Sequence, residues 1–263
     1  MNILVCVKLV PDVSKMKIDK ETNNLIREGV RQIINPADLS ALRFALDLKD
    51  ANDGHLTVLS MGPPDAEDAL RTCIEMGADD GYLISGIEFK GSDTLATSYT
   101  LAEAIKKIGD FDIVFTGDKS LDGDTGQIGP ELAEMLGFNL VSYVQAVDYQ
   151  EGEFFIERKT LKGTEEVKTK APVLLSALRD SAPRPSRFAR NRMAIAKEAE
   201  IKIFNGKNLD LDPHRIGQEG SPTYVKDVFP PSKEEPGHMI EGKDTEELVD
   251  KIIHLLVEKN VIR

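Results

Sequence analysis

The stretch FDIVFTGDKSLDGDTGQIGPEL, from Phe111 to Leu132, gives the clearest indication of the fold. Its apolar run at 111–117 predicts a buried strand, and a glycine-rich segment then leads into a helix at 127–137. A strand, a turn and a helix in this order are typical of one unit of an open α/β sheet. Such sheets bind ligands at the carboxyl ends of parallel strands, so the segment after Thr116 is a candidate binding loop.

The first half of the chain repeats this alternation of strands and helices. The predicted strands cover residues 3–10, 55–62, 81–85 and 111–117, and the predicted helices begin at Pro36, cover 65–76, pass through Leu95, Ala102 and Ile105, and cover 127–137. Asn35 suits the N-cap of the first helix. The alternation predicts a doubly wound, mostly parallel α/β sheet with the core strand order 3-2-1-4-5.

The pattern changes after residue 139. Four strand-like runs, VSYVQAVDY (141–149), EFFIERKT (153–160), EEVKTKA (165–171) and PVLLSAL (172–178), are separated by short turns and predict antiparallel hairpins that extend the sheet. A helix is expected over 186–198. We therefore assign residues 1–204 to one α/β domain.

The remaining residues, 205–263, predict a C-terminal arm and helix. A polar, proline-punctuated segment leads to an amphipathic helix at 244–260, with Asp244 or Thr245 as its cap. The apolar stripe of this helix consists of Leu248, Ile252, Leu255 and Leu256. This helix can fold back onto the domain or bind another chain, and we favour binding to another chain.

Composition restricts the possible functions. The chain of 263 residues has a formal net charge of −12, which disfavours nucleic acid as a partner. No apolar run approaches the roughly 20 residues of a membrane span, and two cysteines without a CxxC pair suggest a reducing, cytoplasmic setting with no metal site. A basic island contains Arg179, Arg184, Arg187, Arg190 and Arg192. It is either a solvated helix start or a docking surface for an acidic partner or a phosphate.

The loop after Thr116 has three interpretations. Its acidic residues follow the first positions of a calcium-binding EF-hand loop, but Gly129 stands where a glutamate is required, which argues against calcium. Glycines and a helix N-terminus favour a phosphate, with hydroxyl donors at Ser120 and Thr125. A plain turn with solvated acids is the third. Neither a GxGxxG pattern nor a P-loop pattern is present, so the sequence does not decide between a phosphate site and a plain turn.

The predicted topology brings further segments to this loop. The strand order reverses between strands one and four, so the end of strand one (Val7 to Leu9), the helix start at 35–38 and the loop after Gly117 should converge on one crevice. Lys8 is then as well placed to contact a phosphate or another part of a bound ligand as to be a solvated strand end. The aspartates of the loop could accept from a ribose, cap the helix or face solvent.

Several segments together resemble the small (beta) subunit of electron-transfer flavoproteins. They are ILVCVKLVPD, INPAD, LSMGPPDAEDALRTCIEMGAD, FDIVFTGDKSLDGDTGQIGPELAEMLG and VKTKAPVLLSAL, which occur in the same order over most of residues 1–200. The resemblance implies an adenine-nucleotide site formed by Cys6, Asn35, Pro36, Ala37, Asp38, Met61, Gly117, Asp118, Lys119, Ser120, Leu121, Asp122, Gly123, Asp124, Thr125, Gly126, Gln127 and Ile128. No side chain need act as acid, base or nucleophile.

The resemblance also implies partners and a cofactor. Members pair with a larger (alpha) subunit that carries FAD; ordinary members bind a structural AMP, whereas electron-bifurcating members bind a second FAD that meets NAD(H). The sequence DGDTGQIGP is more similar to the bifurcating type, so we expect FAD rather than AMP, NAD as substrate, and ferredoxin or flavodoxin as an electron partner. A non-redox, stress-type nucleotide-binding module of the same fold is the alternative.

The family's loop for docking a dehydrogenase should correspond to PRPSRFARNRM (183–193). The residues expected to dock are Arg184, Arg187, Phe188, Ala189, Arg190 and Met193. Ordinary members place an apolar anchor, often leucine, where this chain has Ala189 among arginines. This departure puts an acyl-CoA dehydrogenase partner in doubt and leaves another flavin-dependent dehydrogenase open, such as one that acts on a 2-hydroxy acid.

Overall fold

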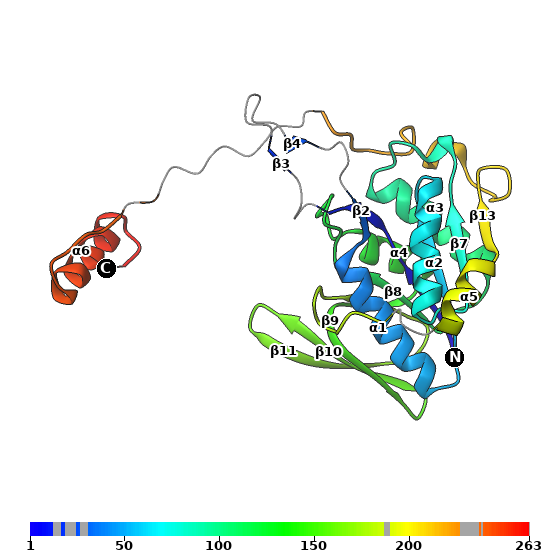
Figure 1. The fold of residues 1–263 in the computed structure, drawn as a ribbon, viewed down its shortest axis with the longest axis horizontal. Helices are drawn as coiled ribbons and strands as arrows, with labels where there is room; N and C mark the ends of the chain where they lie inside the picture. The colour runs from blue at the N-terminus through cyan, green and yellow to red at the C-terminus, as the bar shows by residue number, and fades with distance from the viewer. Residues whose placement is uncertain are drawn as a thin grey trace.

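A nine-stranded sheet forms the centre of the computed structural model, which describes residues 1–12, 17–18, 25–26, 31–186, 190–226, 237 and 239–262 (Figure 1). From one edge to the other, the strands are β11 (Gly163–Thr169), β10 (Glu153–Thr160), β9 (Asn139–Gln150), β12 (Val173–Ala177), β8 (Ile113–Gly117), β1 (Asn2–Cys6), β6 (His55–Met61), β7 (Asp80–Ile84) and β13 (Ile201–Phe204). Two short antiparallel pairs, β2 (Leu9–Pro11) with β5 (Gln32–Ile34) and β3 (Lys17–Ile18) with β4 (Leu25–Ile26), precede the first helix.

The predicted order of the core strands is confirmed. β1 pairs in parallel with β6 on one side and with β8 on the other, and β7 and β12 continue the sheet outward. The strand order therefore reverses between β1 and β8, which is the predicted switch point. The buried, near-continuous apolar runs of these strands are what a parallel sheet covered on both faces requires.

The prediction for PVLLSAL was wrong. This run does not belong to the antiparallel hairpins, because β12 lies parallel between β8 and β9. All of β12 is buried, and an uninterrupted buried run fits the interior of a parallel sheet. Only β9, β10 and β11 form the antiparallel extension. The edge strand β13, parallel to β7, was not predicted.

Helices cover both faces of the sheet. α1 (Pro36–Ala51) and α2 (Glu67–Met76), the latter preceded by the 3-10 turn η2 (Pro64–Ala66), share one apolar core with Ile3 and Val5. α3 (Thr94–Ile108), which follows η3 (Ile87–Phe89), and α4 (Ile128–Leu136) share the second core with Leu4 and Cys6. Alternate β1 residues thus serve opposite faces. The predicted helices are confirmed, including α5 (Arg190–Glu198), which packs on α2.

A strap formed by residues 205–223 crosses the second face after β13. Leu209 and Ile216 are buried there, and the strap includes the 3-10 turn η4 (Pro213–Arg215). The Arg215 guanidinium lies 3.9 Å from the centre of the Tyr99 ring, and the Asp212 amide donates to the Tyr99 hydroxyl at 3.0 Å. The predicted boundary between residues 204 and 205 falls within this packed region. The function assigned to each of the two parts remains a prediction.

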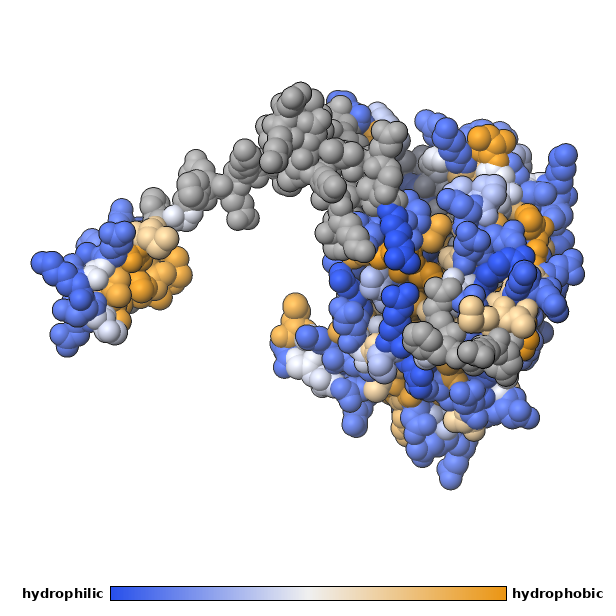
Figure 2. Space-filling view, in the orientation of Figure 1, coloured by the Kyte–Doolittle hydropathy of each residue, from blue (hydrophilic) through white to orange (hydrophobic). Residues whose placement is uncertain are grey.

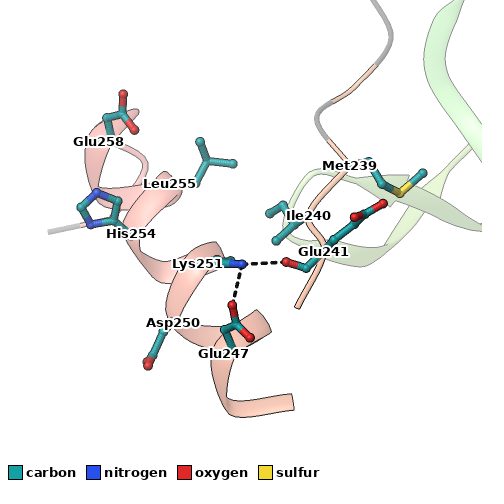
Figure 3. A pocket seen from close by; sticks show the side chains of 9 residues that line it. All are labelled: Met239, Ile240, Glu241, Glu247, Asp250, Lys251, His254, Leu255 and Glu258. Carbon is teal, nitrogen blue, oxygen red and sulfur yellow. Dashed lines mark hydrogen bonds and ion pairs between the residues drawn. The ribbon is translucent and has the colours of Figure 1, made fainter. Parts of the chain in front are cut away.

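The last helix, α6 (Thr245–Glu258), stands apart from the sheet (Figure 1). Asp244 caps it, as predicted, by accepting from the Glu247 amide at 2.9 Å. None of its residues is buried, and Figure 2 shows apolar side chains gathered on it. Lys251 donates to the Glu241 carbonyl at 2.8 Å, which holds the preceding segment beside the helix (Figure 3).

Candidate functional site

Asp38 joins the three segments that the topology brings together. Its Oδ2 accepts from the Lys8 amide at 2.8 Å, just beyond β1. Its Oδ1 accepts from the Gly117 amide at 3.1 Å and from Asn35 Nδ2 at 2.9 Å. One buried carboxylate from the first turn of α1 therefore connects the ends of β1 and β8, and the predicted convergence of these three segments is confirmed.

Two opposing effects set the protonation of Asp38. Burial raises the pKa of this carboxyl, while the hydrogen bonds from Asn35, Lys8 and Gly117 and the charge of Lys8 lower it, with a net pKa of about 7. An ordinary aspartate has a pKa near 3.9. The folded chain therefore takes up a proton between about pH 4 and pH 7 that the unfolded chain does not hold.

This uptake predicts a pH dependence of stability. Because the folded state binds more protons in that window, the Asp38 contribution to the free energy of unfolding should fall as pH rises from 5 to 7, by up to ~1.4 kcal/mol per pH unit. Urea unfolding of wild type and Asp38→Asn at pH 5, 6 and 7 measures it as their difference. Carbon-13 NMR of the Asp38 carboxyl gives its titration midpoint directly. A stability difference that does not change from pH 5 to pH 7, together with an NMR midpoint below pH 5, would contradict the assignment.

Asn35 supports the loop after β8 instead of capping α1. It occupies the predicted N-cap position, but its side chain makes no cap hydrogen bond. Its Nδ2 also donates to the Lys119 carbonyl at 2.9 Å, and its Oδ1 accepts from the Leu121 amide at 3.2 Å. The predicted N-cap position of Asn35 is thus confirmed, but its side chain forms hydrogen bonds with the loop and does not cap the helix. Pro36 begins the helix, as predicted.

The contact between β8 and α1 is very close at Gly117. A Cβ built on Gly117 would lie 2.7 Å from the Ala37 Cβ and 3.1 Å from the Ala37 carbonyl carbon. Only glycine lets the end of β8 approach α1 this closely. Gly117 and Ala37, both predicted site residues, therefore form the floor where the strand and the helix meet.

Ion pairs organise the loop itself. Lys8 Nζ contacts both carboxylate oxygens of Asp122 at 2.8 Å, which ties the loop to the residues just beyond β1. Lys119 pairs with Asp124 at 2.7 Å, and the Asp124 amide donates to the Ser120 carbonyl at 2.9 Å. Burial raises the pKa of Asp122, but the hydrogen bonds from Lys8 and Ser120 and the charge of Lys8 together outweigh burial, so the net pKa is lowered.

The three aspartates thus have different surroundings, and none caps α4. Asp122 and Asp124 face lysines, whereas Asp118 Oδ1 is buried without a hydrogen-bond partner in the described part of the chain. Burial raises the pKa of Asp118, against the hydrogen bond and charge of Lys119. Asp118 is therefore the loop carboxylate with an acceptor left for a ligand hydroxyl or amino group.

The N-terminus of α4 is open toward the loop. Its N-cap residue, Gln127, makes no side-chain cap, so the Ile128 and Gly129 amides lack a capping side chain. Beneath them, a Cβ on Gly129 would lie 3.0 Å from Thr116 Oγ1, a buried hydroxyl with no partner among the described residues. An open helix N-terminus is a favourable place for a phosphate.

The remaining nucleotide-site predictions lie around this centre. Cys6 ends β1 and is buried, and both burial and the charge of Asp38 raise the pKa of its thiol, as suits an unreactive core residue. Met61 ends the neighbouring strand β6 and is half-buried. Gly123, Thr125 and Gly126 complete the loop, where Gly126 has a φ of 67°.

The predicted docking residues lie elsewhere in the fold. Arg187, Phe188 and Ala189 lie outside the described residues, Arg184 is exposed, Arg190 begins α5, and Met193 is exposed on that helix. Arg71 of α2 holds the far end of α5, donating to the carbonyls of Ala196 at 2.7 Å and Ala199 at 3.0 Å. Sequence reasoning missed Arg71, and its position on α2 carries no local signal for this role.

Among the described residues, no group of three or more His, Cys, Asp or Glu side chains is arranged to hold a metal ion. In the same part of the chain, no helix has the length and apolarity needed to cross a bilayer.

The fold defines a doubly wound α/β protein whose converging loops lie at the switch point of the sheet. The family model of the electron transfer flavoprotein domain matches residues 22–207. The chain is 42% identical over 262 residues, covering both chains fully, to the electron transfer flavoprotein subunit beta of Clostridium acetobutylicum. It is 39% identical over 263 residues, again over both full lengths, to the caffeyl-CoA reductase-Etf complex subunit CarD of Acetobacterium woodii. Protein FixA of Azorhizobium caulinodans is 42% identical over 254 residues, which are 93% of this chain and 90% of the relative. The chain therefore belongs to the electron transfer flavoprotein family, among its beta subunits.

Proposed function

We propose that this chain is the FAD-binding beta subunit of an electron-bifurcating flavoprotein that works in the cytoplasm. The activity exchanges a hydride with NAD(H) and delivers single electrons to a flavin of the alpha subunit and to ferredoxin or flavodoxin, in complex with a flavin-dependent dehydrogenase. A bound FAD supplies the redox chemistry, and the residues of this chain bind and orient it. Full-length similarity to a subunit of a caffeyl-CoA reductase-Etf complex supports this proposal.

One observation gives the main support for the proposed nucleotide site. The open N-terminus of α4 faces the loop whose Asp118 Oδ1 has no protein partner in the described residues. The amides of Ile128 and Gly129 suit a phosphate, and the Asp118 carboxylate suits a donor group of a ribose or a base. The residues present therefore fit an adenine nucleotide, with Lys8 and Lys119 as nearby cations.

FAD is favoured over AMP because space remains beside the loop glycines. A Cβ on Gly123 would meet only Ser120 Oγ, at 3.4 Å, and a Cβ on Gly126 would meet only the Asp118 carbonyl, also at 3.4 Å. Both positions therefore leave backbone that a diphosphate could approach closely, which supports the longer cofactor.

The cofactor content of the purified complex tests this proposal. The chain is coexpressed with its alpha subunit, and flavin absorbance and extracted nucleotides are measured per heterodimer. Two flavins per heterodimer are expected. One flavin with one AMP would overturn bifurcation and favour a structural AMP, and a colourless monomer that binds ATP would favour a stress-type nucleotide-binding module.

A bulky side chain at Thr125 should expel the nucleotide. Thr125 is exposed in the loop and makes no hydrogen bond within the described residues, so Thr125→Trp should leave the sheet folded while it obstructs the crevice. We expect nucleotide content to fall at least tenfold, as an order-of-magnitude loss from steric exclusion, with an unchanged far-UV circular dichroism spectrum. Thr125→Ser is the control, and unchanged nucleotide content in Thr125→Trp would refute this placement.

We also propose that α6 packs on the alpha subunit and that residues 183–193 dock the dehydrogenase. The exposed apolar side chains of α6, including Ile252 at 43% and Ile253 at 47% exposure, support the first assignment. The exposed Met193, at 53%, and the basic surroundings of α5 support the second.

A further inference from the structure

Thr94, the first residue of α3, contacts the residue at the mouth of the proposed nucleotide site. Its hydroxyl lies 3.1 Å from Gln127 Oε1 and 3.2 Å from Glu131 Oε1, and it donates to this pair of acceptors. Ser98, one turn further along α3, donates to the other oxygen of Glu131 at 3.0 Å. The start of α3 therefore holds the start of α4 through side chains.

The hydrogen bond from Thr94 orients the side-chain amide of Gln127. Its Oε1 is turned toward Thr94, and its Nε2 has no hydrogen-bond partner within the described residues. Gln127 stands at the N-cap of α4 without capping it, beside the open amides of Ile128 and Gly129. An amide held by its oxygen leaves both N–H groups for an external acceptor, such as a phosphate or ribose oxygen.

Asp93, one residue before Thr94, holds the end of the strap. Its Oδ2 accepts from the Thr223 amide at 3.0 Å and from the Thr223 hydroxyl at 2.8 Å, and its own amide donates to Ser221 Oγ at 2.8 Å. Its Oδ1 caps α3 by accepting from the Ala96 amide at 3.1 Å. Two consecutive residues therefore connect the end of the strap, from which the chain leads toward α6, with the side chain at the nucleotide crevice.

We propose that Thr94 is a positioning residue for nucleotide binding and that Asp93 links it to the end of the strap, so that nucleotide binding and ordering of residues 221–223 stabilise each other. This inference rests on the proposed nucleotide site. Thermodynamic linkage requires the effect to act in both directions: a looser strap weakens nucleotide binding, and a bound nucleotide protects the strap.

Titration of the full chain with AMP and with FAD tests the first link. Thr94→Val removes the hydroxyl at nearly constant shape and should weaken binding roughly three- to tenfold, the effect of one orienting hydrogen bond. Thr94→Ser should restore it. Thr97→Val, on the same helix but without a side-chain hydrogen bond in the described structure, should bind like wild type. Thr94→Val binding as tightly as wild type would overturn the role of Thr94.

Amide hydrogen exchange tests the link to the strap. AMP should slow exchange of the Thr223 and Ala96 amides in wild type, and this protection should be lost in Thr94→Val at saturating AMP. Thr223→Val should weaken AMP binding about two- to threefold. Unaltered strap exchange together with unaltered AMP binding in Thr223→Val would overturn the link. A wild-type chain that binds neither nucleotide would instead overturn the proposed site itself.

Discussion

Gly117→Val is expected to destabilise the fold by about 2–4 kcal/mol and to abolish nucleotide binding. The new Cβ would lie 2.7 Å from the Ala37 Cβ, so β8 and the first turn of α1 must move apart. That movement lengthens the 3.1 Å bond from the Gly117 amide to Asp38 Oδ1 and leaves a buried carboxylate without one of its donors. Urea unfolding measures the loss of stability, and nucleotide extraction measures the loss of ligand.

Gly123→Ala provides the control for this prediction. Its Cβ would meet only Ser120 Oγ at 3.4 Å, an ordinary contact in an exposed part of the loop. This variant should unfold within about 0.5 kcal/mol of wild type, as surface substitutions usually do. If Gly117→Val were equally stable, the close approach of β8 and α1 would not be needed for the fold.

The double variant Ile252→Glu with Leu256→Glu is expected to weaken association with the alpha subunit by about two to four orders of magnitude. Each of these side chains belongs to the predicted apolar stripe of α6, and neither is buried within this chain. Burial of an aliphatic side chain contributes about 1.5–3 kcal/mol, and a glutamate in its place loses this and brings an unpaired charge into the contact. Analytical ultracentrifugation of the coexpressed pair measures the effect.

A charge-matched variant separates the loss of apolar contact from the added charge. His254→Glu with Lys259→Gln makes the same change in formal net charge at exposed polar positions near the end of α6. It should associate like wild type. Equal weakening by both variants would show that net charge, and not the apolar face, governs association.

The sequence predicted the parts of the fold that depend on local patterns. The apolar runs of β1, β6, β7 and β8 and the helices between them follow from periodicity, and the switch point follows from their order. Strand β12 was misassigned because it follows a series of strand-like runs separated by short turns, although its uninterrupted apolar character was a signal for the sheet interior. Strand β13 was missed because it has only four residues, and the strap was missed because its few apolar residues, such as Leu209 and Ile216, show no regular spacing.

The candidate site was predicted as a set of segments but not as a set of interactions. The convergence around Asp38 followed from topology, whereas the contacts of Asn35 with Lys119 and Leu121 could not, because an asparagine before a proline equally suits a helix cap. The pairing of Lys8 with Asp122 and the contact of Thr94 with Gln127 join residues far apart in sequence. Their geometry depends on how the helices pack on the sheet.

Both outer edges of the central sheet are poorly suited to pairing with another sheet. β11 carries Glu165, Glu166 and Lys168, of which Lys168 forms an ion pair with Glu153 of β10, and β13 at the opposite edge has only four residues. Charged or short edge strands oppose edge-to-edge aggregation. For the proposed beta subunit, whose α6 has uncovered apolar side chains, these edges oppose self-association along the sheet before the proposed alpha subunit binds.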